Sequence, residues 1–159
     1  MGINVVEKGK EGERQVARAL NAALLKVLLK MQWPEEDIPR MSTVIQRNQN
    51  QTAVGGCDLN NVFGLAIEVK RQETLSIESW WRQCVEAAGR NREFPVLCYR
   101  QNHGQWRVMM YAALSLPMLN EGNQFASLPA RVTVDWEVFL DWFAMWVERK
   151  LMNGDYPRT

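Results

Sequence analysis

Two carboxylates and a lysine lie close together in the sequence, where a polar stretch meets an apolar run. Asp58 follows a Gly-Gly-Cys sequence, and Glu68 and Lys70 lie in and just after the β-prone run of residues 65–69. Because side chains alternate between the two faces of a strand, Glu68 and Lys70 project to the same side. Two acids and a lysine on one patch predict a cation held between the acids.

The residues between the two acids favour a turn. Residues 60–64 contain two asparagines and a glycine, which supply turn chemistry. A turn centred on Phe63 predicts a β-hairpin in which Asp58 faces Glu68. A Glu-x-Lys pair is also common on a solvated strand face. The upstream Asp58 and the apolar run between the acids favour a functional site over that alternative.

These side chains suit metal-assisted chemistry on a phosphate. Asp58 and Glu68 offer hard oxygen ligands, which favour Mg²⁺ or Mn²⁺ over zinc. The carbonyl of Val69 is a natural further ligand, and Glu13 could bind the water shell of the metal or a second ion. A divalent ion held there can polarise a phosphate and lower the pKa of a bound water. Lys70 could hold that water and stabilise negative charge developing on phosphorus.

Length and composition limit the class of protein. The chain has 159 residues, which suits one domain over residues 1–159 with a single core. Because its net charge is only +1, the protein could bind a nucleic acid only through a local patch of basic residues. Three cysteines without a Cys-x-x-Cys pair and one histidine argue against a disulfide framework and a zinc site. Without a signal-peptide pattern or a membrane-spanning run, we expect a soluble, cytoplasmic protein.

A first helix is predicted over residues 8–31. Its apolar residues recur at helical spacing: Val16, Ala17, Leu20, Leu24, Val27, Leu28 and Met31. Glu13 falls on the inward edge of this stripe, where it could serve the site. The alternative is a Glu in the first turn that favours the helix dipole. Residues 43–47 could form a strand, and the polar residues 48–56 predict a loop bordering the acidic patch.

A second helix is predicted from Ser76, a plausible N-terminal cap, to about Arg90. Trp81 belongs to its apolar stripe, and Trp80 and Gln83 lie on an adjoining face. On this view Trp80 and Trp81 cannot both face one core. The exposed tryptophan is therefore expected to stack on an unpaired base or to lie in an interface.

The second half of the chain is predicted to contain strands and a terminal helix. A β-hairpin spans residues 95–111 and turns at residues 102–104, and residues 112–130 are expected to be loop-rich because of their prolines and glycine. A strand at residues 131–134 leads to a helix over residues 135–151, which contains three tryptophans. This helix is apolar nearly all round, so we expect a core helix that also contacts a subunit or DNA. A core role alone is the alternative.

A helix, strands carrying an acid pair, another helix and more strands make an α/β core. The segments Lys8-Gly9-x-x-x-Glu13-Arg14, Gly56-x-Asp58 and Ile67-Glu68-Val69-Lys70 together resemble the PD-(D/E)XK nucleases. The resemblance covers about residues 8–111 and is strongest to archaeal Holliday junction resolvases and resolvase-like nucleases of phages and prophages. It implies a restriction-endonuclease-like fold, a mixed central β-sheet flanked by helices. The Trp-rich helix within residues 131–151 is an addition to that core.

The same resemblance implies which residues act. The implied catalytic set consists of Glu13, Asp58, Glu68 and Lys70. Gln83 sits where many relatives carry a supporting glutamine on the helix after the lysine. The proline that the family places before its Asp is replaced here by Cys57. Basic residues bordering the patch are expected to contact DNA phosphates: Arg14, Arg47, Arg71 and Arg82.

The main functional hypothesis is a Mg²⁺-dependent, structure-selective DNA endonuclease that hydrolyses phosphodiester bonds at branched DNA, as Holliday junction resolvases do. A homodimer would present two equivalent sites to the paired scissile phosphates of a four-way junction. Three alternatives remain. The chain could be a nuclease of the same fold acting on DNA ends or single strands, a non-catalytic nucleic-acid-binding relative, or an interaction protein built around its C-terminal helix.

Overall fold

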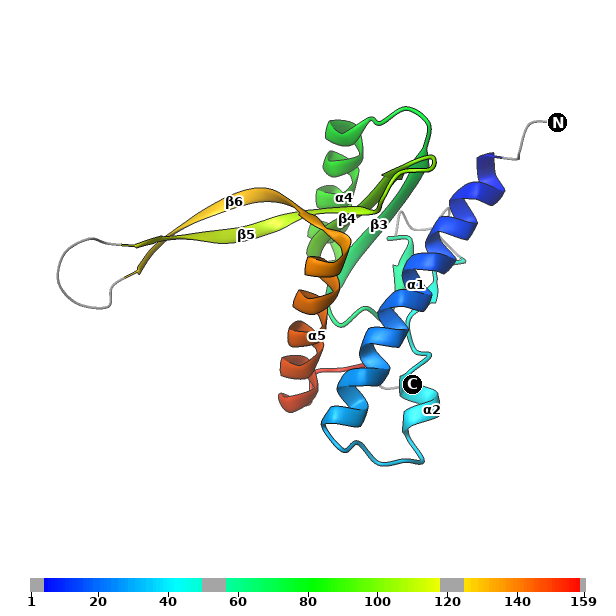
Figure 1. Ribbon diagram of the computed structural model, residues 1–159, viewed down its shortest axis with the longest axis vertical. Coiled ribbons are helices and arrows are strands. Elements are labelled where there is room, and N and C mark those ends of the chain that lie inside the picture. Colours follow the sequence, from blue (N-terminus) through cyan, green and yellow to red (C-terminus); the bar gives the residue numbers. More distant parts are fainter. Residues whose placement is uncertain (1–4, 50–56, 118–124, 158–159) are drawn as a thin grey trace.

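The computed structural model describes residues 5–49, 57–117 and 125–157 (Figure 1). The elements follow in this order: α1 (Val5–Lys30), α2 (Ile38–Met41), β1 (Gln46–Arg47), β2 (Leu59–Asn60), β3 (Leu65–Gln72), α4 (Ile77–Asn91), β4 (Phe94–Gln101), β5 (Arg107–Pro117), β6 (Phe125–Asp135) and α5 (Trp136–Met152). None of the helices in these ranges combines the length and apolar character that crossing a membrane requires.

A four-stranded sheet of order β3-β4-β5-β6 forms the centre of the molecule. β3 and β4 are parallel and are joined through α4, because parallel neighbours need a crossover connection. β5 and β6 are added antiparallel. The sheet is therefore mixed. β1 and β2 form a separate two-stranded pair.

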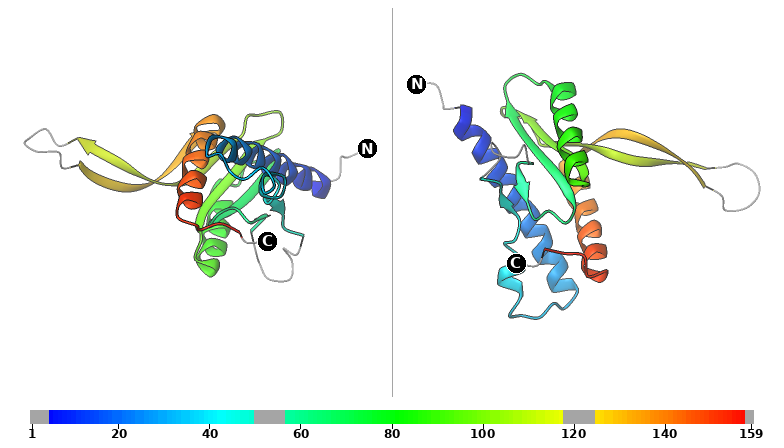
Figure 2. Two further views of the ribbon diagram at one scale, coloured as in Figure 1. Left: turned by 90° about the horizontal axis from the view of Figure 1, so that it is seen from below. Right: turned by 180° about the vertical axis from the view of Figure 1, so that it is seen from behind.

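Side chains that alternate along the strands divide the core into two layers. Alternate residues of β3 and β4, such as Ile67, Val69 and Val96, pack with α1 and α5 in the larger apolar cluster. Leu97 and Tyr99 project to the other face and pack under α4. Helices thus cover both faces of the sheet, as Figure 2 shows. The predicted α/β fold with a mixed sheet flanked by helices is confirmed.

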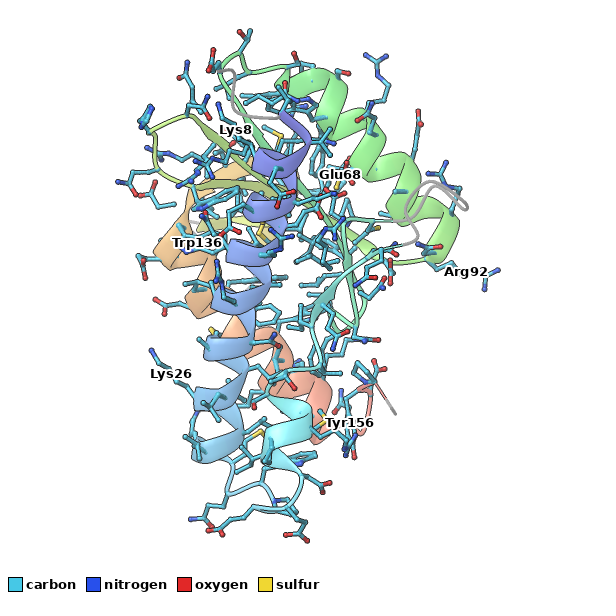
Figure 3. All side chains as sticks on the ribbon, turned by 90° about the vertical axis from the view of Figure 1, so that its right-hand side faces the viewer. Lys8, Lys26, Glu68, Arg92, Trp136 and Tyr156 are labelled. Carbon is cyan, nitrogen blue, oxygen red and sulfur yellow. The ribbon has the colours of Figure 1, made fainter. Side chains whose placement is uncertain are left out.

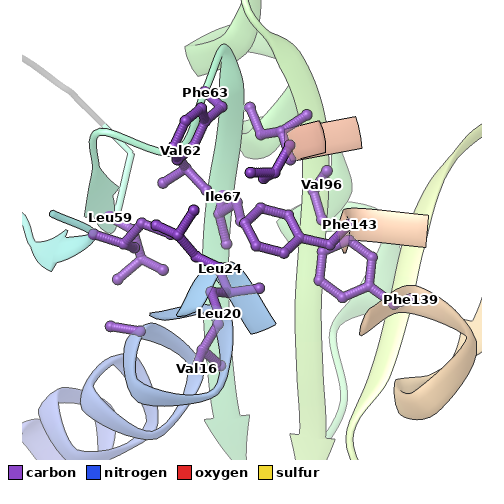
Figure 4. Close-up of a cluster of buried hydrophobic side chains, with 14 of the residues drawn as sticks. Val16, Leu20, Leu24, Leu59, Val62, Phe63, Ile67, Val96, Phe139 and Phe143 are labelled. Atoms are coloured by element: carbon purple, nitrogen blue, oxygen red, sulfur yellow. The ribbon is translucent and has the colours of Figure 1, made fainter. Parts of the chain in front are cut away.

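The C-terminal helix α5 belongs to the core. Phe139, Phe143 and Val147 are completely buried and pack against α1, β3 and β4 (Figure 4). On the neighbouring side, the Trp146 indole Nε1 donates a hydrogen bond of 3.0 Å to the Phe63 carbonyl. Met145, in contrast, is 72% exposed. The core role predicted for this helix is confirmed, and α5 also buttresses the turn that follows β2.

β5 and β6 extend beyond the four-stranded sheet as a long two-stranded arm that points away from the body of the molecule (Figure 1). β5 and β6 each have 11 residues and stay in register from Arg107 opposite Asp135 to Pro117 opposite Phe125. The expectation that residues 112–130 are loop-rich is therefore wrong for residues 112–117 and 125–130; residues 118–124 lie outside the described ranges. Prolines are tolerated here because edge strands can lack a ladder hydrogen bond.

Replacing Phe143 by Ala should lower the free energy of unfolding by about 3–5 kcal/mol, because the ring leaves a cavity between α1, α5 and the sheet. Urea unfolding followed by circular dichroism measures this change. Met145→Ala, on the exposed side of the same helix, is the matched control and should cost little. Equal unfolding midpoints for the two variants would show that α5 is not part of the cooperative core.

Candidate active site

The turn after β2 brings Asp58 against β3. Asn61, Phe63 and Gly64 adopt left-handed backbone conformations, with φ of 62°, 55° and 83°. Asn and Gly tolerate this region, whereas Phe63 requires support from its surroundings, and its ring is buried in the core. The turn chemistry predicted for residues 60–64 is thus present. It ends β2 and starts β3 at Leu65.

The predicted hairpin pairing is wrong in one respect. β2 pairs with β1, with Arg47 opposite Leu59, and not with β3. Asp58 nevertheless lies beside β3, because its N–H donates to the Ile67 carbonyl at 3.0 Å. Its Oδ2 accepts a hydrogen bond of 2.6 Å from the Val69 N–H. Asp58 and Glu68 are therefore neighbours, as expected, through local hydrogen bonds and not through a regular ladder.

The Asp58 carboxyl is buried next to a second acid. Burial and the charge of Glu68 together raise the pKa of Asp58 to about 7, against the opposing effects of the Val69 N–H and Lys70. Two carboxylates in a poorly solvated site resist being ionised together. A cation between them would remove that repulsion, so the electrostatics of this pair favour a bound metal ion.

Glu68 and Lys70 form an ion pair on the same face of β3. The Lys70 Nζ lies 2.6 Å from Glu68 Oε1, and both side chains are mostly buried. Burial lowers the pKa of Lys70, but the charges of Glu68, Asp58 and Glu13 outweigh it, so that the pKa is raised overall. Lys70 is therefore a protonated, positively charged donor near neutral pH. Such a group can stabilise negative charge on a phosphate.

Glu13 joins this group from α1. Its carboxylate is buried and forms an ion pair with the Arg47 guanidinium Nε. Its negative charge raises the pKa of both Asp58 and Lys70. The alternative explanation, a first-turn acid that favours the helix dipole, is wrong because α1 begins at Val5. The structure thus brings together all four residues of the implied catalytic set.

The donor set of this site fits a hydrated divalent ion. Within the described ranges, no group of three or more Asp, Glu, His or Cys side chains is arranged to hold a metal. The adjoining carboxylates of Asp58 and Glu68 are hard oxygen donors that repel each other in the absence of a cation. Mg²⁺ usually keeps several waters and takes only one or two protein carboxylates. Two acids are therefore sufficient for such an ion.

The arginines predicted to contact DNA differ in their exposure and in whether they form ion pairs within the protein. Arg14 binds Glu7 at 2.9 Å and Glu11 at 3.4 Å on the outer side of α1. Arg47 is engaged by Glu13, a partner that the sequence did not indicate. Arg82 is exposed on α4. Arg71 lies at the end of β3 and, within the part of the chain that the structure describes, makes no ion pair.

Two predicted residues of α4 lie differently from the other candidates. Gln83 is exposed, and no hydrogen bond joins it to a described residue. Trp80 and Trp81 are both buried, with 5% and 7% of their surfaces exposed, in one cluster with Tyr99. The expectation that one of them is free to stack on a base is wrong. Successive helix residues point about 100° apart, and the sheet face beneath α4 is broad enough to cover both indoles.

The pKa of Asp58 predicts how pH affects the metal-free protein. The folded carboxyl holds its proton up to about pH 7, whereas the unfolded one loses it near 3.8, so stability is lost as pH rises through this interval. Asp58→Asn cannot ionise and should escape this loss. In EDTA at about pH 8, its melting temperature should exceed that of the wild type by roughly 5 °C. Asp141→Asn, at an exposed position of α5, is the control. Parallel stability curves for Asp58→Asn and the wild type would contradict the assigned pKa.

The chain was compared with models of protein families. Residues 4–136 match the family model described as "Phage putative PDDEXK endonuclease". This range contains the four clustered residues and both strands of the arm, so it extends beyond residues 8–111, and it ends where α5 begins. Searches of curated proteins and of solved structures found no match to the chain. The family match covers most of the sequence, and the chain belongs to the phage PD-(D/E)XK endonuclease family.

Proposed function

We propose that this protein is a divalent-metal-dependent DNA endonuclease that cuts branched DNA, as a Holliday junction resolvase does. The observation that carries the proposal is the buried pair of Asp58 and Glu68 with Lys70 bound to the second acid at 2.6 Å. An acid pair that favours a cation, beside a protonated lysine, is suited to hydrolysis of a phosphodiester. The membership in an endonuclease family supports this chemistry.

Each residue of the site has a distinct task in this proposal. Asp58, Glu68 and the Val69 carbonyl would hold Mg²⁺ or Mn²⁺, which when bound supplies charge stabilisation at the phosphate and lowers the pKa of a bound water. Lys70 orients that water and stabilises negative charge on phosphorus. Glu13 is already ion-paired with Arg47, so it would bind the water shell and not the ion. Gln83 would act from α4, where its exposed amide is free to contact the substrate.

Removing the side chain of Glu68 or of Lys70 should separate DNA cleavage from DNA binding. Glu68→Ala and Lys70→Ala should each lower the cleavage rate by at least about a hundredfold, because each removes a group that acts at the transition state. Binding of a four-way junction in EDTA should remain. Glu86→Ala, at an exposed position of α4, is the control. Undiminished cutting by either purified variant would refute the roles given to these side chains.

The substrate panel for this measurement decides among nuclease types. Labelled four-way junction, flap, linear duplex and single strand should be tested with Mg²⁺, Mn²⁺ or EDTA. Symmetric nicks at the junction are expected. Cutting confined to ends or single strands would retain the metal chemistry and contradict the branched substrate. Binding without any cutting would indicate a non-catalytic relative. In a bacterial host, the enzyme would meet such DNA in the cytoplasm.

We propose that the enzyme acts as a homodimer assembled through the arm. Leu114 and Leu128 lie opposite each other on the arm and are 47% and 55% exposed. At the base of the arm, Tyr111, Val132, Val138 and Trp142 border an apolar hollow of about 490 Å³. A second copy related by two-fold symmetry would cover these surfaces mutually, and two equivalent sites would match the paired strands of a junction.

Glutamates introduced in place of the exposed leucines of the arm should prevent this dimer from forming. The wild type is expected to have twice the mass of one chain by light scattering, and the variant with Leu114→Glu and Leu128→Glu should be monomeric. Leu29→Glu, which replaces an equally exposed leucine at the end of α1, should remain dimeric. A monomeric wild type at concentrations that support junction cleavage would exclude the dimer.

A further inference from the structure

Two arginines meet at the ends of β3 and β4, and neither forms an ion pair with a residue that the structure describes. The parallel register of these strands pairs Arg71 with Arg100, so their side chains leave the same face of the sheet. The Nε atoms of both guanidinium groups are buried and have no hydrogen-bond partner within the described ranges. Burial lowers the pKa of Arg100, and the charge of Arg71 lowers it further. Like charges directly opposite each other on neighbouring strands are unfavourable.

The two arginines are held by packing and not by ion pairs. The Arg100 guanidinium lies over the Trp106 ring, 5.0 Å from its centre, in a cation–π contact. Gly12 of α1 approaches this layer closely, since a Cβ at that position would lie 3.5 Å from both the Arg71 Cβ and the Trp106 ring. The helix and the tryptophan therefore fix the stems of the arginines. A preorganised pair of cations, neither of which forms an ion pair within the described ranges, is suited to binding an anion.

A hollow of about 400 Å³ lies next to Arg71. Lys8 and Asn102 border it together with Glu73, whose carboxylate is 3.8 Å from the Lys8 Nζ and accepts a hydrogen bond of 3.1 Å from Asn102 Nδ2. Glu73 thus pairs with Lys8, and in the part of the chain that the structure describes no ion pair joins it to Arg71 or Arg100. Lys8 and Glu68 lie toward the same end of the molecule (Figure 3). The hollow therefore lies at the end that carries the acidic site.

We propose that Arg71 and Arg100 form a seat for a backbone phosphate of the DNA strand near the cleavage site. This inference rests on the proposed function, because it takes DNA as the ligand. Arg71 and Glu68 are three residues apart, or about 10 Å along β3, which corresponds to about three nucleotides of axial rise. Glu68 and Arg71 project to opposite faces of β3, but β3 is the edge strand of the sheet, so both faces meet at its free edge, where Asp58 binds the Val69 N–H. A phosphate held there positions the strand without reading its sequence.

The seat is tested by the affinity for a four-way junction and its salt dependence in EDTA, where no cleavage occurs. Arg71→Gln and Arg100→Gln should each weaken binding about tenfold and reduce the slope of log affinity against log salt by about 0.9. Arg100→Lys keeps the charge and should keep most of the slope. Arg18→Gln is the matched control, because Arg18 is an exposed arginine bound by Glu11 on the outer side of α1. If Arg71→Gln and Arg100→Gln bind the junction with the same affinity and salt slope as the control variant, the proposal is wrong.

A second measurement does not depend on DNA. At constant ionic strength, inorganic phosphate should raise the melting temperature of the wild type relative to chloride, and Arg100→Gln should abolish this increase. Circular dichroism of each variant checks that it is folded. Phosphate stabilisation that is lost in Arg100→Gln while junction binding is unchanged would assign the seat to a free anion and overturn the DNA assignment. A wild type that binds phosphate but no DNA would refute the proposed function itself.

Discussion

The short hydrogen bond from the Val69 N–H to Asp58 Oδ2, 2.6 Å long, ties the site to the sheet. It fixes the buried Asp58 carboxyl beside Glu68, where burial and the neighbouring acid disfavour the ionisation of Asp58 unless a positive charge lies nearby. Lys70 supplies part of that charge and Glu13 adds another acid. The turn of residues 61–64, supported by the hydrogen bond from Trp146, holds Asp58 in this position. The fold thus maintains an electrostatic arrangement that a divalent ion would stabilise.

The edge strand β3 carries functional side chains on one face and core side chains on the other. Glu68 and Lys70 project to one face, and Ile67 and Val69 project into the core against α1 and α5. At its end, Arg71 leaves the core face and meets Arg100. β3 therefore carries Glu68, Lys70 and Arg71 within four residues, and Asp58 is hydrogen-bonded to its Val69. Because β3 is paired with β4 and its apolar residues pack in the core, the strand holds these side chains in fixed positions.

The arm, which lies within the residues that match the nuclease family, and α5, which follows them, relate differently to the core. α5 contributes Phe139 and Phe143 to the interior, so it is an integral layer and not a removable extension. The arm continues β5 and β6 beyond the sheet and exposes Leu114 and Leu128. An interior helix adds stability through buried area, whereas an apolar arm that extends away from the body gains nothing for the isolated chain. The two elements therefore have different physical roles.

The sequence by itself determined the α/β class, the main helices and the four clustered residues, because periodicity, turn residues and the order of motifs are local properties. The predictions were less accurate where an element's pairing, burial or extent depends on contacts with distant segments of the chain. Pairing of β2 with β1, burial of both Trp80 and Trp81, and strands through residues 112–117 and 125–130 all follow from tertiary packing that local propensity does not encode. The meeting of Arg71 and Arg100 likewise required the parallel register. A strand–helix–strand connection could have suggested that register, but only the folded sheet decided which residues face each other, because register is set by contacts between distant segments.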